Sequence, residues 1–94
     1  TGNSLIGTNG EFQVLNYQEN EYRIRAHNNG GVDLYYDHSK KFETLSNGVK
    51  VTGNIELLEA GADIKLLNDN GKLLCGAGSD LQIYHDGSDS FICT

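Results

Sequence analysis

The side chains that most often carry chemistry are sparse in this sequence. The three histidines are His27, His38 and His85, and none has a histidine or cysteine two or four residues away, as a local metal site would need. Ser39 and Ser88 follow two of them, but no Gly-x-Ser-x-Gly segment presents either serine as a nucleophile. We therefore predict no catalytic residue, no metal site and no cofactor, and we expect that the protein is not an enzyme.

Acidic side chains are common, with 13 aspartates and glutamates in 94 residues. Several of them could supply oxygen ligands to Ca²⁺: Asp33, Asp37, Asp80, Asp86 and Asp89. Residues 86–89 nevertheless lack the loop spacing and the bidentate glutamate of an EF-hand. Glycoside hydrolysis uses paired carboxylates, but chance pairs are expected in so acidic a chain. Turn capping by aspartate is the interpretation we favour.

Two aromatic pairs stand before aspartates, Tyr35-Tyr36 and Tyr84-His85. Such rings could stack on sugar faces, so these four residues are the candidate glycan contacts. The alternative is cross-strand packing of the aromatic rings, which β-strands favour.

The net charge of −6 argues against a nucleic-acid partner and against an anionic membrane surface. No apolar run approaches the roughly 18 residues that cross a bilayer, so we expect no membrane insertion. The sequence contains no methionine, so we expect that Thr1 is not a translation start. Cys75 and Cys93 are flanked by apolar residues, which suits either buried thiols or a disulfide.

Turn signals and alternating segments recur along the whole chain. Asn-Gly occurs four times, Asp86-Gly87 adds a fifth signal, and such dipeptides favour tight type I′ hairpins. Polar and apolar residues alternate between the turns, which predicts an all-β chain of about eleven short strands. The alternating segments are residues 11–14, 23–26, 32–34, 49–51, 55–57, 64–66 and 81–83.

Residues 32–42 also align without gaps to residues 81–91, which places Phe42 over Phe91. Repetition of this kind is typical of stacked or elongated architectures.

Two segments resemble a repeat of tail-fibre and other structural proteins of marine and freshwater bacteriophages. The first reads GGVDLYYDHSKKFET and continues to GVKVTG, and the second reads DLQIYHDGSDSFI. The resemblance implies elongated, usually trimeric β-structured rods that project from a virion, and it implies no catalytic residues.

We therefore expect residues 1–94 to form one β-rich repeat unit of a longer tandem chain or a polymer, in a β-prism or β-solenoid architecture. Its partner would be itself, as a trimer or helical filament, in a virion or an extracellular fibre. An alternative hypothesis is a module that recognises host-surface polysaccharide, and a third is a depolymerase fragment. The predicted self-assembly core consists of alternating apolar residues: Val32, Leu34, Phe42, Val49, Val51, Ile55, Leu57, Ile64, Leu66, Leu81, Ile83 and Phe91.

Overall fold

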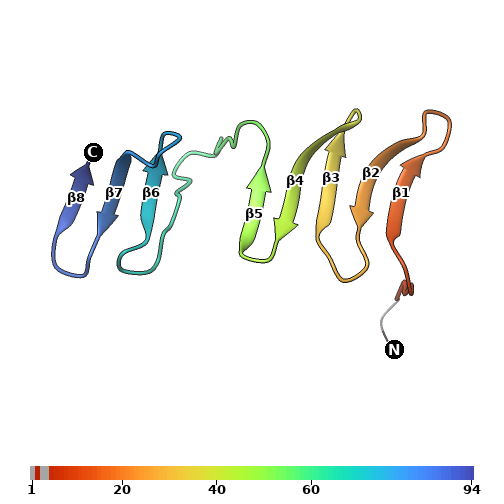
Figure 1. Cartoon of the computed structure of the whole chain (residues 1–94), viewed down its shortest axis with the longest axis horizontal. Coiled ribbons are helices and arrows are strands. Elements are labelled where there is room, and N and C mark those ends of the chain that lie inside the picture. Colours follow the sequence, from red (N-terminus) through yellow and green to blue (C-terminus); the bar gives the residue numbers. More distant parts are fainter. Residues whose placement is uncertain (1, 3–4) are drawn as a thin grey trace. The chain divides into compact units, whose positions relative to one another are not determined.

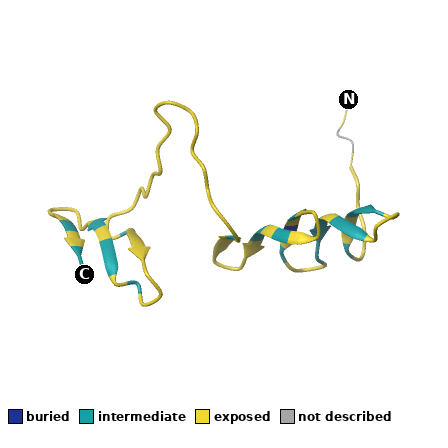
Figure 2. Ribbon diagram, turned by 90° about the horizontal axis from the view of Figure 1, so that it is seen from above, coloured by how far each residue is buried: buried dark blue, intermediate teal, exposed yellow. Residues whose placement is uncertain are grey.

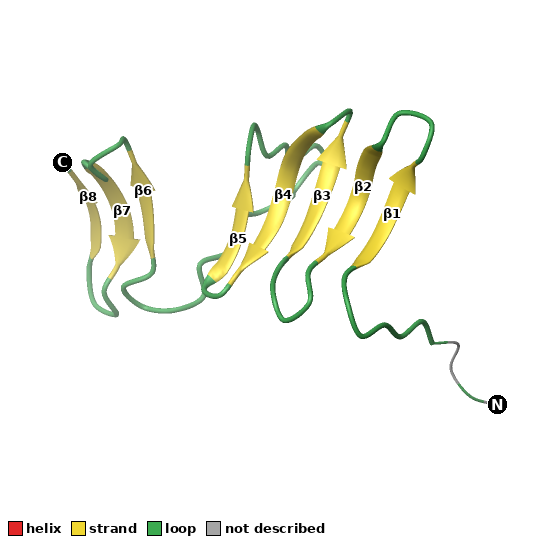
Figure 3. Cartoon of the chain, turned by 45° about the vertical axis from the view of Figure 1, so that its right-hand side comes forward, coloured by secondary structure: helices red, strands yellow, loops and turns green. Residues whose placement is uncertain are grey.

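The computed structural model describes residue 2 and residues 5–94, and these contain strands, turns and loops but no helix (Figures 1 and 3). The prediction of an all-β chain is confirmed. The described residues accordingly include no helix that could span a membrane. The eight strands are β1 (Phe12–Asn16), β2 (Glu21–Ala26), β3 (Val32–Tyr36), β4 (Ser39–Leu45), β5 (Gly48–Val51), β6 (Lys72–Cys75), β7 (Leu81–His85) and β8 (Ser90–Cys93).

The chain divides into two compact units, Thr1–Glu56 and Leu57–Thr94. The first unit holds a five-stranded antiparallel sheet in the order β1-β2-β3-β4-β5, and the second holds a three-stranded antiparallel sheet in the order β6-β7-β8. In both sheets each strand pairs with the next one along the chain, as short connections favour. The prediction that the whole chain is one repeat unit of something longer stays a prediction.

The pairing register gives the five-stranded sheet two chemically different faces. Residues that pair directly across an antiparallel sheet share a face, and neighbours along one strand point to opposite faces. One cross-strand row is apolar on all five strands: Val14, Ile24, Leu34, Phe42 and Val51. The adjacent row, on the other face, is polar: Gln13, Arg25, Asp33, Glu43 and Lys50.

We call these the apolar face and the polar face of the first unit. The apolar face also includes residues two positions along the strands from the central row, namely Phe12, Ala26, Val32 and Val49. The alternation read from the sequence therefore reports the face of a side chain correctly wherever the pairing is regular.

Two β-bulges modify this alternation. Arg23 is the extra residue opposite Val14 and Leu15, and Lys41 is the extra residue opposite Leu34 and Tyr35. A bulge reverses the side of the sheet to which the following residues point. The bulges therefore bring Tyr22 and Lys40 onto the polar face, where both make contacts.

The hairpin loop with positive φ at both of its residues is not at an Asn-Gly dipeptide. Asp37 and His38 form the two-residue loop between β3 and β4, and both have positive φ, 46° and 69°, as a type I′ turn requires. In the β4–β5 hairpin the two loop residues are Ser46 and Asn47, because Gly48 already pairs with Leu45. The prediction that Asn47-Gly48 occupies the centre of a type I′ turn is wrong by one residue.

Eight strands, rather than about eleven, are present among the described residues. The alternating segments 55–57 and 64–66 are not strands, and their apolar side chains are exposed, Ile55 at 71% and Ile64 at 73%. Alternation describes a side-chain pattern, but a strand also needs a hydrogen-bonded neighbour, and none of the strands pairs with these segments.

The two copies of the aligned repeat differ in their hairpins. Phe42 pairs with Leu34 across a bulged hairpin with a two-residue loop, whereas Phe91 pairs with Tyr84 across a regular hairpin with a four-residue loop. Sequence alignment without gaps therefore matches residues that occupy different positions in the two sheets.

Burial is slight in both units (Figure 2). No hydrophobic residue of the described chain is buried, and Asp33, at 3% exposure, is the one buried residue among those described. The apolar face is uncovered, since Val32 is 38% exposed, Leu34 42% and Val49 58%.

Candidate functional site

The polar face of the first unit carries a connected set of charged groups. Arg25 donates to both carboxylate oxygens of Glu11, from Nε at 2.8 Å and from Nη2 at 3.1 Å. His27 lies between two carboxylates, with Nδ1 at 3.2 Å from Glu11 Oε2 and Nε2 at 2.8 Å from Asp33 Oδ2. Lys40 Nζ completes the set at 3.4 Å from Asp33 Oδ2. Three strands meet in this network, β2 through Arg25, β3 through Asp33 and β4 through Lys40, together with Glu11 just before β1 and His27 just after β2.

The network holds its carboxylates in the ionised form. The hydrogen bond from Arg25, followed by one from Gln13, lowers the pKa of Glu11 to about 2. The same pairing raises the pKa of the Arg25 guanidinium. Burial opposes ionisation of Asp33, but hydrogen bonds from His27 and Lys40 outweigh it, and the pKa of Asp33 is lowered. The acids are therefore charged partners of cations, and neither is poised to exchange a proton near neutral pH.

Two of the four candidate glycan contacts pack against other aromatic rings. The ring of Tyr35 lies 5.8 Å from the ring of Tyr22, and Arg25 Cζ lies 4.8 Å above Tyr22. In the second unit Tyr84 stacks on Phe91, with ring centroids 4.9 Å apart and an angle of 22° between the planes. The two contacts between aromatic rings join neighbouring strands, and they are the cross-strand packing that the sequence offered as the alternative.

The other two candidates are exposed. Tyr36 is 75% exposed at the end of β3, and His85 Nδ1 lies 3.0 Å from Ser90 Oγ across the β7–β8 hairpin. The two members of each predicted glycan-binding pair therefore differ in their surroundings. Tyr35 and Tyr84 pack on neighbouring rings, whereas Tyr36 and His85 are exposed to solvent.

The acidic loop between β7 and β8 is a capped turn. Asp86 Oδ1 accepts hydrogen bonds from the backbone N–H groups of Ser88 at 2.9 Å and Asp89 at 2.8 Å. These bonds lower the pKa of Asp86. The capping role expected from the sequence is confirmed for this residue.

Sequence reasoning missed one group of possible metal ligands. Glu19, Glu21 and His38 each offer a ligand atom, and these atoms lie within 4.8 Å of one another. His38 Nε2 is 3.7 Å from Glu21 Oε2. The residues meet because the β1–β2 and β3–β4 turns lie at the same end of the sheet (Figure 1). Glu21 and His38 are 17 residues apart in the sequence, and this spacing does not indicate a metal site unless the pairing of the strands is known.

The two cysteines lie on different edges of the second sheet. Cys75 on β6 pairs with Leu81, and Cys93 on β8 pairs with Gln82. Because Leu81 and Gln82 are neighbours on β7, the two thiols point to opposite faces, and two strand spacings of about 4.8 Å separate their strands. A disulfide needs Cα atoms within about 7 Å, so the folded sheet cannot join these cysteines to each other. Cys75 is exposed and Cys93 is half-buried, and both are free.

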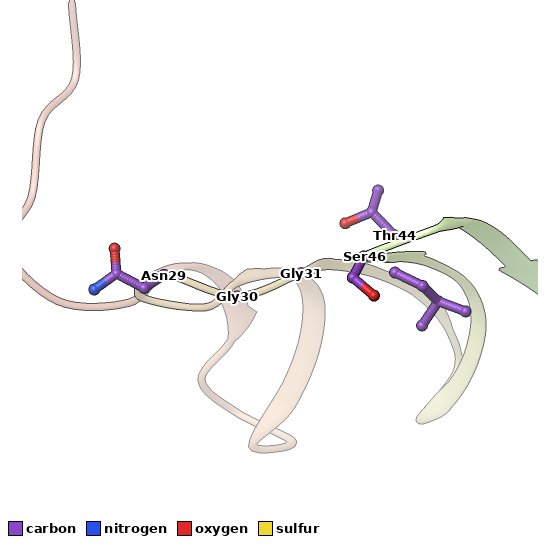
Figure 4. Close-up of a pocket in the computed structure, with 6 residues that line it drawn as sticks. Asn29, Gly30, Gly31, Thr44 and Ser46 are labelled. Carbon is purple, nitrogen blue, oxygen red and sulfur yellow. The ribbon is translucent and has the colours of Figure 1, made fainter.

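A hollow beside the β2–β3 loop is lined by backbone and uncharged side chains (Figure 4). Gly31 fits closely there, since a Cβ at this position would overlap the carbonyl oxygen of Thr44. Asn29 and Ser46 also line the hollow, which offers no charged group for chemistry. A second hollow, in the second unit, is mainly apolar and includes Ile64 and Ile83.

The predicted self-assembly core divides into three groups. Five of its members lie on the apolar face of the first unit: Val32, Leu34, Phe42, Val49 and Val51. Four lie in the segment without strands, at positions 55, 57, 64 and 66. In the second sheet Leu81 and Ile83 share one face, and Phe91 lies on the other because it pairs with Tyr84.

Comparison with protein-family models, curated proteins and solved structures finds no match to this chain. The structural class of the chain therefore rests on its geometry alone. It is an all-β chain in which charged side chains of the polar face pair with one another, and in which no apolar side chain of the described residues is buried.

Proposed function

We propose that this chain is a structural component of a fibre or filament, a repeat of the bacteriophage tail-fibre type that assembles with copies of itself. The observation that carries the proposal is the lack of any buried hydrophobic residue in the described chain, together with a continuous apolar row across five strands. A folded chain gains most of its stability from the burial of apolar side chains. In this chain that burial has to come from a partner.

The sheet edges support the same proposal. The outer strands β1 and β5 of one sheet and β6 and β8 of the other each have one strand neighbour. Their remaining N–H and C=O groups face outward and are a template for strands of another chain. Pairing along these edges would extend the sheets into a prism or solenoid, in a virion or an extracellular fibre. The charge of −6 would keep such a rod soluble and discourage sideways association.

The charged groups favour a structural role over catalysis. Glu11 and Asp33 are held ionised by cations, and Asp86 caps a turn. Each of these carboxylates is engaged in holding a strand or a loop.

Negative-stain electron microscopy of the purified chain tests the proposal. Rods or filaments with a regular axial repeat are the expected result. Compact particles of monomer mass, seen at every concentration up to the highest one attainable, would contradict it.

A further inference from the structure

We infer that the apolar face of the first unit is covered by the same face of a second copy of this chain, so that the assembly has a core shared between copies. The inference rests on the proposed function and names the surface by which the copies associate. The row through Val14, Leu34 and Val51 would lie at the centre of this core, because it crosses all five strands.

The described chain exposes more surface than a compact monomer of the same mass. The chain exposes 8168 Å², whereas a folded monomer of 10.3 kDa exposes about 5,400 Å², which leaves an excess of about 2,800 Å². A standard interface buries about 800 Å² on each partner. The excess is spread over both units and the segment between them, and the uncovered side chains of the apolar face, such as Leu34 at 42% and Val49 at 58%, are part of it.

The polar face is not the surface that needs a cover. Its cations and carboxylates already pair with one another, and Asp33 is already withdrawn from water beneath His27 and Lys40. Packing a second layer onto this face would remove water from Arg25 and Glu11 without providing new partners, which costs free energy.

The apolar face suits a copy of itself better than a charged partner. The nine apolar residues named on it carry no charge, and Glu21, which pairs with Asn16 at one end of the face, lies beside His38, so the centre of the face offers nothing to a charged partner. Two sheets of this kind pack about 10 Å apart with interdigitated side chains, as in a β-sandwich. Here the two layers of the sandwich would come from different chains.

Leu34→Lys tests the inference, because Leu34 is on the central strand of the five and its side chain is 42% exposed in the single chain. Gln13→Lys is the matched control, since it adds the same charge to the opposite face of the same sheet. Sedimentation velocity over a range of concentrations measures association, and circular dichroism checks that each variant keeps its β-structure.

We expect the wild type to associate and the concentration needed for association to rise at least roughly 100-fold in Leu34→Lys, because a buried charge without a partner is costly. Gln13→Lys should stay within about threefold of the wild type, since exposed charges contribute little. Persistent association of folded Leu34→Lys would overturn the inference and leave the proposed function standing. A wild type that stays monomeric, or that binds lipid vesicles without self-association, would overturn both.

A second measurement applies if Leu34→Lys does not fold. Two proteins are compared, and both carry Cys75→Ser and Cys93→Ser to remove the native thiols. The first also carries Leu34→Cys on the apolar face, and the second carries Gln13→Cys on the polar face. A short bis-maleimide should link two copies rapidly in the first protein and slowly in the second. Equal linking rates would show that the apolar face does not meet its counterpart.

Discussion

Asp33→Asn removes the charge of the one buried residue of the described chain and keeps its size. The Asp33 side chain is 4% exposed, and its Oδ2 atom lies 2.8 Å from His27 Nε2 and 3.4 Å from Lys40 Nζ. A hydrogen bond to a charged group contributes about 1 kcal/mol more than a neutral one. The pair with Lys40 adds about 0.5 kcal/mol, because the lysine side chain is 39% exposed and partly screened by solvent. We expect a loss of about 1.5 kcal/mol in the free energy of unfolding.

Urea unfolding at pH 7, followed by circular dichroism at one fixed protein concentration, measures this loss. Asp37→Asn is the matched control, since it makes the same chemical change four residues away at an exposed turn where asparagine also tolerates positive φ. The control should lie within about 0.5 kcal/mol of the wild type.

A double-mutant cycle with Lys40→Gln separates the ion pair from the hydrogen bond, with an expected coupling of about 0.5 kcal/mol. If Asp33→Asn unfolds at the same urea concentration as the wild type, the carboxylate does not hold the polar face together and the reasoning is refuted.

Three further predictions follow from other parts of the molecule. Phe91→Ala should lower the free energy of unfolding by about 2 kcal/mol, because the half-buried ring of Phe91 stacks on Tyr84. Urea titration measures this loss, and a loss near zero would contradict the prediction. Under mild oxidation mass spectrometry should find no link between Cys75 and Cys93 within one folded chain, and a dominant intrachain link would contradict the observed register. Because the folded pKa of Glu11, about 2, lies below its ordinary value of 4.5, the stability it contributes is present above pH 4.5 and is lost as the pH falls toward 2. Glu11→Gln should flatten this acid limb of the stability curve, and an unchanged limb would count against the pairing.

Much of the fold could be predicted because the relevant signals are local. Alternation of side chains along a strand places Val32 and Leu34 on one face and Asp33 on the other without reference to any neighbour. Turn capping by Asp86 is equally local, since donor and acceptor are within three residues. The all-β class follows from such patterns and was predicted correctly.

The candidate site was harder to predict because it depends on pairing between distant segments. Glu11 and Arg25, or His27 and Asp33, meet only through the register of neighbouring strands, and the bulge at Lys41 brings Lys40 to Asp33. A bulge reverses the following side chains, and no residue type in the sequence marks where it falls.

What the sequence alone determined is the all-β class, the alternation of side chains along most strands and the acidic charge. Only the tertiary structure decided that five of the twelve predicted core residues share one uncovered face and that the charged residues opposite are already paired. Segments 55–57 and 64–66 also alternate in polarity without forming strands, because no neighbouring strand pairs with them. Side-chain alternation is encoded residue by residue, whereas hydrogen bonding and burial require a partner that the local sequence does not specify.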